Sequence, residues 1–414
     1  MTDRVLGVDI CRGRVVACLL TELPIEPHET YQDYEFFEFP LTRDGVQALL
    51  DLEPTTVVYE PTGVAYSRAW VARIEESGIE TMAVDHAKLR AYRKGLGLPD
   101  KDDEADSLAL ACYRLDPMKQ GRAAFLRKKP PIVLEVRRLS LRLQHLDRRK
   151  SPIINRLKQD LETCFPEQAT KDCDKAPLFW GWLAGERKSA KYDRLLEQTI
   201  GLGLYPEIRT EAQALTQCLR EETEIERRLE LLIKTHDEFR PYLRVLSRWG
   251  FGLRQQAILM TQIFPLEDFL KDGKVEVRQR RSRKTGKKIT QHRSLRRFQK
   301  AIGVAPTRED SGDVQKRRRS GSSLCRKTLW QWQFTRIENL SIKTRNAIVL
   351  EFREIFREAS ARFSIADVSH LVDRTQLQNS TKLKGVRLKL ARAYIRRKVS
   401  IRLFYDLVNE LRSD

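Results

Sequence analysis

RVLGVDI at residues 4–10 and GRVVACLLTEL at residues 13–23 are two apolar runs joined by a short turn. Apolar runs of this length around a glycine-containing turn are typical of paired strands. Strand signals return in YEFFEFPL, TTVVYEPTG and ETMAVD, and helical signals occur in GVQALLDL, AYSRAWVARIEESG and HAKLRAYRKGL. We therefore expect the order βββαβαβα, which gives a mixed sheet with helices on its faces.

Beyond residue 103 the strand signals largely stop and helical periodicity takes over. Residues 132–165 carry a long apolar stripe interrupted at Pro152, residues 210–239 carry a second stripe, and the segment between them is irregular. Two long, charged helices with apolar stripes indicate an antiparallel coiled-coil arm. The following segment contains a Gly-x-Gly turn between two helices and ends in a basic amphipathic helix. We therefore expect three domains, at residues 1–130, 131–240 and 241–414.

The composition favours a helix-rich protein of the cytoplasm. Hydrophobic residues make up 41% of the 414 residues and charged residues 32%. No apolar run approaches the roughly 18–20 residues that span a bilayer, and the charged first residues do not form a signal peptide. The seven cysteines include no CxxC pair, which argues against a zinc ribbon and a disulfide framework.

The charge is divided unevenly along the chain. Residues 1–106 contain 11 Lys and Arg against 21 Asp and Glu, a net charge of −10, within a total of +20. Residues 107–414 therefore contain 66 against 36, a net charge of +30. This division predicts metal chemistry in the acidic part and binding of a polyanion such as nucleic acid along the rest. The alternative is a protein whose charged helix faces are merely solvated.

Four acidic residues stand within five positions of the stretch LPDKDDEADSLALA, residues 98–111. Like charges at helical spacing repel each other, so a cation is expected nearby. A divalent ion would bind such carboxylates, but a solvated run that caps a helix would also explain them. Asp102 and Asp103 both stand at helical spacing from Asp106, so either of them can share a face with it.

Two further acids are expected at strand ends. Asp9 lies in the first strand, and Glu60 ends a buried strand before a Pro-Thr-Gly turn. With Asp103 and Asp106 they make a set of four carboxylates, which suits Mg²⁺ or Mn²⁺ because these hard cations prefer oxygen ligands. Two such ions can activate a nucleophile and stabilise a leaving oxygen in phosphoryl transfer.

Three motifs carry a resemblance to a known family. They are Gly7-Val8-Asp9, Glu60-Pro61-Thr62-Gly63 and Lys101-Asp102-Asp103-Glu104-Ala105-Asp106-Ser107. They resemble the GxD, E-x-T-G and K-T-D-x-x-D-A motifs of the DEDD transposases and site-specific recombinases of the insertion sequence 110 family. That family includes Piv-type invertases and bridge-RNA-guided recombinases. Asp102 replaces the usual Thr and Ser107 the usual Ala; of the two neighbouring acids, the resemblance favours Asp103.

The resemblance continues in the C-terminal third. The family's PGIG, GL-x-P…SG and K-x-GN-x-x-x-R motifs correspond to Trp249-Gly250-Phe251-Gly252, to Gly303-Val304-Ala305-Pro306 with Ser311-Gly312, and to Gly321-Ser322 with Arg326. The resemblance implies that Ser311 is a nucleophile that cleaves DNA through a phosphoserine link. From the residues alone, Ser311 would be interpreted as a turn or cap serine. The neighbouring Ser320, Ser322 and Ser323 fit the motif less well.

The resemblance also implies the architecture and the partners. It implies an α/β ribonuclease H-like (RuvC-like) N-terminal domain, an α-helical coiled-coil arm and a mostly α-helical C-terminal transposase domain. The implied activity is DNA transposition or site-specific recombination on double-stranded donor and target DNA. It further implies a homodimer or tetramer, a structured guide RNA in some members, and a prokaryotic cytoplasmic location without a membrane.

Basic residues of the C-terminal third are the expected nucleic-acid contacts. Eleven Lys and Arg lie between residues 278 and 300 with no acid among them, and such contacts predict binding that weakens steeply with salt. The expected contacts are Arg278, Arg280, Arg281, Arg283, Lys284, Lys287, Lys288, Arg293, Arg296, Arg297, Arg317, Arg318, Arg319 and Arg326.

Other classes of protein remain open from the sequence. A RuvC-like junction or flap endonuclease would use the four acids and would need no serine. A sugar kinase or ATPase of the actin-like type would need a second glycine-rich phosphate loop, which we do not find. An inactive DNA-binding protein would not need all four acids.

Overall fold

The computed structural model describes residues 3–61, 66–98, 100–119, 121, 124–169, 177–282, 286–305, 307–311, 314–318, 320–362 and 380–413. For residues 307–311, 314–318 and 380–384 only the backbone is described. The chain folds into two compact units, Met1–Lys129 and Pro130–Asp414. The arm and the C-terminal segment, which we expected as separate domains, therefore lie within one unit. Within the described ranges, no helix combines the length and hydrophobicity needed to cross a bilayer.

The first unit is built on a five-stranded mixed sheet with the order β3-β2-β1-β4-β5. Its antiparallel part consists of β1 (Val5–Ile10), β2 (Arg14–Leu20) and β3 (Phe37–Pro40). The parallel part adds β4 (Thr56–Tyr59) and β5 (Glu80–Ala83) beside β1. The expected mixed α/β fold of this part is confirmed. It could be predicted because apolar runs and turn residues mark each strand locally.

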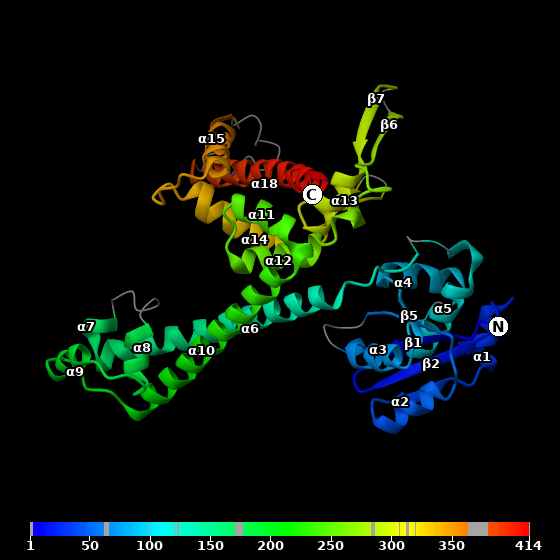
Figure 1. Ribbon diagram of the computed structural model, residues 1–414, viewed down its shortest axis with the longest axis horizontal. Coiled ribbons are helices and arrows are strands. Elements are labelled where there is room, and N and C mark those ends of the chain that lie inside the picture. Colours follow the sequence, from blue (N-terminus) through cyan, green and yellow to red (C-terminus); the bar gives the residue numbers. More distant parts are fainter. Residues whose placement is uncertain are drawn as a thin grey trace. The chain divides into compact units, whose positions relative to one another are not determined.

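Helices cover both faces of this sheet (Figure 1). One core contains Trp70 and Leu49, from the helices α3 and α2, and the other contains Leu89 and Leu110, from α4 and α5. The sequence did not predict α1, because this short helix has no buried residue and hence no apolar stripe. The helices are α1 (Pro27–Asp33), α2 (Arg43–Leu50), α3 (Tyr66–Glu76), α4 (His86–Gly95), α5 (Asp103–Leu115) and the 3₁₀ turn Pro117–Lys119.

A glycine on β1 lets α5 lie directly against the sheet. A Cβ atom added at Gly7 would stand 2.1 Å from the carbonyl oxygen of Ser107 and 2.5 Å from the amide nitrogen of Ala111. No side chain other than hydrogen fits there, so Gly7 is required for this close approach. The contact lies one turn from the start of α5 and two residues before Asp9, and it therefore sets the distance between the acids on these two elements.

Two long helices form the arm in the second unit, α6 (Pro131–Cys164) and α10 (Pro206–Thr235). They are antiparallel, because Glu135 pairs with Arg228 whereas Arg142, further along α6, pairs with the earlier residue Glu221. The expected interruption at Pro152 is wrong: α6 continues through this proline, whose ring is exposed. Packing of the apolar stripe against α10 compensates for the hydrogen bond that the proline removes.

The far end of the arm closes on a small core of its own. Trp180 and Trp182 are buried there with Leu161 and Ala212 of the two long helices. In its described residues, the segment that we expected to be irregular contains the short helices α7 (Pro166–Ala169), α8 (Pro177–Leu183) and α9 (Ala190–Glu197).

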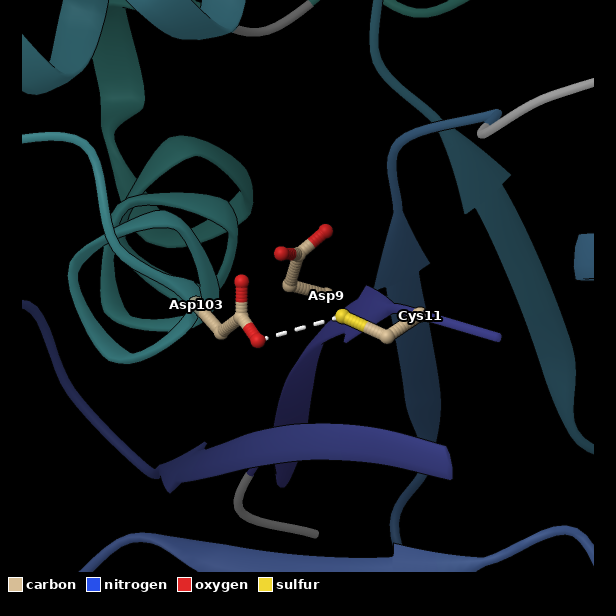
Figure 2. Close-up of side chains that lie close together, drawn as sticks. All are labelled: Asp9, Cys11 and Asp103. Atoms are coloured by element: carbon tan, nitrogen blue, oxygen red, sulfur yellow. Dashed lines mark hydrogen bonds between the residues drawn. The ribbon is translucent and has the colours of Figure 1, made fainter. Parts of the chain in front are cut away.

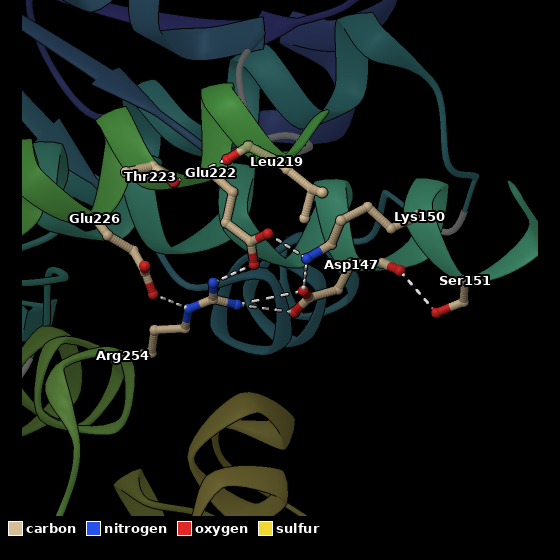
Figure 3. A network of polar contacts seen from close by, with 8 residues as sticks. All are labelled: Asp147, Lys150, Ser151, Leu219, Glu222, Thr223, Glu226 and Arg254. Carbon is tan, nitrogen blue, oxygen red and sulfur yellow. Dashed lines mark hydrogen bonds and ion pairs between the residues drawn. The ribbon is translucent and has the colours of Figure 1, made fainter. Parts of the chain in front are cut away.

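A network of charges joins both arm helices to α12 (Leu253–Ile263) of the C-terminal helices (Figure 3). The Arg254 guanidinium contacts Glu222, lies 2.6 Å from Glu226 and lies 3.3 Å from Asp147. Lys150 completes the network by contacting Glu222 and lying 3.4 Å from Asp147. Burial alone would raise the pKa of Glu222, but hydrogen bonds from Lys150 and Arg254 hold it below its usual range. The network therefore stabilises the junction in its fully ionised form.

The C-terminal part is mostly helical, with one continuous core that also includes the near end of the arm. Trp249 and Trp332 lie at its centre, and the Trp249 indole N–H donates to Asp406 at 2.9 Å. The helices are α11 (Arg240–Arg248), α12 (Leu253–Ile263), α13 (Arg293–Ala301), α14 (Ser323–Trp332), α15 (Ala347–Arg362) and α18 (Ser380–Ser413), with shorter turns at Asp237–Phe239, Leu266–Phe269 and Gln333–Glu338. Two hairpins interrupt them, β6 (Val277–Arg281) with β7 (Lys288–His292), and β8 (Thr307–Ser311) with β9 (Val314–Arg318).

Candidate metal centre

The carboxyl ends of two parallel strands bring the first two acids to one edge of the sheet. Val8 of β1 pairs with Tyr59 of β4, so Asp9 and Glu60 occupy the next level of the register. The crevice outside the carboxyl ends of parallel strands is the usual place for a ligand in an α/β sheet. The helix α4 begins near the same edge, three residues after the end of β5.

The helix α5 starts at the same edge. Asp102 caps this helix, and Asp103 is the candidate metal ligand. Asp102 is the N-cap: its Oδ1 accepts the Ala105 N–H at 2.6 Å, and its Oδ2 accepts the Tyr31 hydroxyl at 3.0 Å. Both of its oxygens are therefore engaged in holding the helix start. The structure places the next residue, Asp103, beside Asp9. Asp103 rather than Asp102 is therefore positioned to bind the same cation as Asp9.

Asp9, Cys11 and Asp103 form a compact cluster. One potential ligand atom from each lies within 4.8 Å of the other two, and Figure 2 shows the three side chains next to one another. The Cys11 thiol donates a hydrogen bond to Oδ2 of Asp103 at 3.1 Å. Arg14 Nη2 stands 3.7 Å from the same Asp103 oxygen. Sequence reasoning missed Cys11, whose position two residues after Asp9 is the signal that would have suggested it.

Burial and neighbouring carboxylates raise the pKa values of two members of this cluster. Burial, followed by the charges of Asp103 and Asp106, raises the pKa of Asp9 to about 7. Burial and the hydrogen bond to Asp103 raise the pKa of Cys11 to about 12, so its sulfur remains a neutral thiol at pH 7. A hard cation such as Mg²⁺ or Mn²⁺ prefers oxygen ligands, so the carboxylate oxygens are the favoured ligand atoms.

The other two acids contact basic side chains of the chain itself. Asp106 lies 2.8 Å from the guanidinium of Arg93, and both side chains are nearly inaccessible, at 8% and 3% exposure. Burial raises the pKa of Asp106, although Arg93 and Lys101 oppose the shift. Glu60 contacts Nδ1 of His86. Sequence analysis missed both partners. They lie on α4, whose many basic residues are typical of a helix exposed to solvent.

Glu60 and Asp106 line a pocket of about 370 Å³. Its remaining lining includes Arg90, Lys94 and Lys101, whose side chains are exposed. Arg90 and Lys94 are four residues apart on α4, so they lie on one face of that helix. Two carboxylates beside three accessible cations make a pocket that suits an anion such as a phosphodiester more than a neutral ligand.

The donor set fits a hard divalent cation at Asp9 and Asp103. Mg²⁺ is commonly bound by one or two carboxylates together with waters and phosphate oxygens of the substrate. Asp9 forms no salt bridge with any residue that the structure describes, and burial together with the charges of Asp103 and Asp106 raises its pKa. Glu60 and Asp106 stand at the same edge, but each would have to share its oxygens with His86 or Arg93 to join the ligand set.

Ser311 is the last residue of β8 and pairs with Val314 across the turn of its hairpin. Its side chain lies outside the described residues, and it belongs to the second unit whereas the acids belong to the first. The rival serines have structural partners: the Ser320 hydroxyl donates to the carbonyl of Ala305, and Ser322 is the N-cap of α14. The nucleophilic role of Ser311 stays a prediction.

The expected nucleic-acid contacts fall into four groups. Arg278, Arg280, Arg281, Lys287 and Lys288 are exposed on or beside the β6–β7 hairpin. Arg293 and Arg297 pair with Glu276, and Arg297 and Arg326 donate to backbone carbonyls, so these arginines also hold local structure. Arg296, on α13, is exposed. Arg283, Lys284 and Arg319 and the side chains of Arg317 and Arg318 lie outside the described residues.

No protein-family model matches this sequence, and a search of curated proteins finds no significant match. An interpretation of the function therefore depends on the residues and on the geometry of the site.

Proposed function

We propose that this protein is a divalent-metal-dependent DNA transposase or site-specific recombinase. The observation that carries the proposal is the convergence of Asp9 and Asp103 at the carboxyl edge of the sheet, with Glu60 and Asp106 beside them. A divalent cation bound there would activate a nucleophile and stabilise the leaving oxygen of a phosphodiester.

The architecture of the first unit supports a ribonuclease H-like interpretation. A mixed sheet with helices on both faces carries the first acid on its central strand, the second after the adjacent parallel strand, and the others on a helix packed on that central strand. This is the arrangement that the resemblance to the DEDD recombinases implies. Gly7 of the first motif has a physical reason here, since it permits the contact of α5 with β1.

The charge of the chain supports nucleic acid as the substrate. The pocket beside the acids carries Arg90, Lys94 and Lys101, and residues 107–414 have a net charge of +30. Arg90 and Lys94 would hold the phosphates that flank the cleaved bond, while Asp9 and Asp103 hold the cation. In this proposal the Ser311 hydroxyl oxygen attacks the scissile phosphorus, and the bridging sugar oxygen of the DNA leaves. The products are a phosphoserine link and a DNA end with a free hydroxyl group.

The test uses a supercoiled plasmid that carries the DNA flanking the gene, with Mg²⁺ and the full-length protein. We expect cleaved DNA that stays covalently attached to protein on a denaturing gel. Asp103→Asn should abolish cleavage, whereas Glu104→Gln, which removes the same charge from the exposed neighbouring residue, should not. Ser311→Ala should abolish both cleavage and attachment, and Ser323→Ala is its matched control.

The outcomes separate this proposal from a structure-specific nuclease. If Ser311→Ala still cleaves and no attachment forms, the protein is a RuvC-like endonuclease without serine chemistry. If Asp103→Asn cleaves as well as the wild type, the acids are not the catalytic site. Sequencing the nucleic acid that copurifies with the protein, and measuring its mass by light scattering, would test the predicted guide RNA and the predicted dimer or tetramer.

A further inference from the structure

The β6–β7 hairpin is a two-stranded ribbon with a strongly basic surface. Residues 277–292 contain seven Lys and Arg and no Asp or Glu. Every described residue of the two strands is exposed except Gln291, which is half-buried. Figure 1 shows the ribbon extending beyond α13, the helix that follows it. A ribbon that stays exposed among the described residues, with several positive charges and no acid, indicates a surface for a polyanion.

The base of the ribbon is held firmly to α13. Glu276 precedes β6 and lies 2.7 Å from Arg278, 2.9 Å from Arg297 and 3.8 Å from Arg293. Its backbone N–H donates to the Ser294 hydroxyl at 2.8 Å. The side chain of Glu276 is 9% exposed, while its three arginine partners keep exposed surface. These contacts tie the base of the ribbon to α13.

The pleat of the strands gives the ribbon two different faces. Alternate residues point to opposite sides, so Arg278 and Arg280 share the side of Glu276. Gln279 and Arg281 point to the other side, opposite Thr290 and Lys288 on β7. This second face combines the amide, guanidinium and hydroxyl groups that can form hydrogen bonds with base edges.

We infer that the β6–β7 ribbon enters the major groove of double-helical DNA and reads base edges with Gln279, Arg281 and Thr290. This inference rests on the proposed function only in taking DNA as the substrate. A two-stranded ribbon fits the roughly 12 Å wide major groove of B-form DNA. At about 3.4 Å per residue, strands of five residues would follow about five base pairs.

The same geometry argues against double-helical RNA as the partner of the ribbon. The major groove of A-form RNA is deep and too narrow for side chains to reach the base edges. Arg281 matches the O6 and N7 acceptors of guanine, and Gln279 matches the donor and acceptor of adenine, in the major groove of DNA. Arg280 on the opposite face would contact phosphate and would add affinity without adding sequence preference.

The test selects bound sequences from a pool of DNA duplexes with ten randomised base pairs, using full-length protein without divalent cations. The affinity for the selected duplex is then compared with that for a scrambled duplex and for an RNA duplex of the selected sequence. We expect Arg281→Ala and Gln279→Ala each to lower the ratio of selected to scrambled affinity by roughly 5- to 150-fold. Arg280→Ala, which removes the same charge as Arg281→Ala, should weaken binding to both DNA duplexes equally.

Three results would overturn the inference. They are the selection of no sequence, equal effects of Arg281→Ala and Arg280→Ala on the ratio, and RNA duplex binding that the ribbon substitutions weaken more than DNA binding. Circular dichroism of each variant checks the fold, which should be unaffected because the substituted residues are exposed. Binding is measured without divalent cations and needs no cleavage, so a failure of the proposed cleavage chemistry would leave this result unchanged.

Discussion

Replacing Asp9 by Asn should stabilise the metal-free protein, in spite of removing a candidate ligand. Burial and the nearby acids raise the pKa of Asp9 to about 7, whereas an unfolded aspartate has a pKa of about 3.9. In the fold Asp9 therefore keeps a proton that the unfolded chain has already lost. As the pH rises from about 4 to about 7, the folded state loses stability relative to the unfolded state.

The size of this effect follows from the two pKa values. At about 1.36 kcal/mol per pKa unit, the penalty above pH 7 is on the order of 4 kcal/mol. The Asn side chain has nearly the same shape and carries no charge, so Asp9→Asn should remove the penalty. We expect the variant and the wild type to be equally stable at pH 4, and the variant to be more stable at pH 8.

Hydrogen exchange of the peptides that cover β1 and α5 measures the stability of this unit within the full chain. Exchange rates are corrected for their intrinsic pH dependence, and each protein is measured with and without Mg²⁺. Mg²⁺ should increase protection in the wild type at pH 8 and have little effect in Asp9→Asn. A variant that is less stable than the wild type at pH 8, or a difference that does not change with pH, would refute the reasoning.

Three further substitutions test separate parts of the structure. Gly7→Ala should destabilise the first unit by about 3 kcal/mol or more, measured by hydrogen exchange of α5, because the new methyl group would overlap the Ser107 carbonyl. Cys11→Ser should leave the Mn²⁺ affinity in calorimetry unchanged, since a hard cation prefers the carboxylate oxygens to sulfur; a large loss would indicate a thiolate ligand. Arg254→Ala should cost about 2–3 kcal/mol in urea unfolding of the second unit, whereas the exposed Arg227→Ala should have a much smaller effect; equal losses would contradict a role of the network.

The order of strands and helices in the first unit could be predicted because each element carries its own signal. Apolar alternation and turn residues mark β1 to β5, and the parallel pairing of β1 with β4 then places Asp9 level with Glu60. The helix α1 gave no such signal, because it buries nothing. At Pro152 the local rule predicted a break, but packing of α6 against α10 maintains the helix.

The partners of the acids could not be predicted from spacing. That Arg93 pairs with Asp106, and His86 with Glu60, depends on how α4 lies over the sheet edge. The choice between Asp102 and Asp103 also required the structure, since both have helical spacing to Asp106. The hydrogen bonds from Ala105 and Tyr31 to Asp102 make that residue the cap.

Anomalous diffraction from crystals of the protein soaked in Mn²⁺ would test the central claim most directly. We predict an anomalous peak about 2.0–2.3 Å from carboxylate oxygens of both Asp9 and Asp103, with water or an oxygen of Glu60 or Asp106 completing the coordination. A peak bound to the sulfur of Cys11, or no peak at this edge of the sheet, would contradict the proposed metal centre.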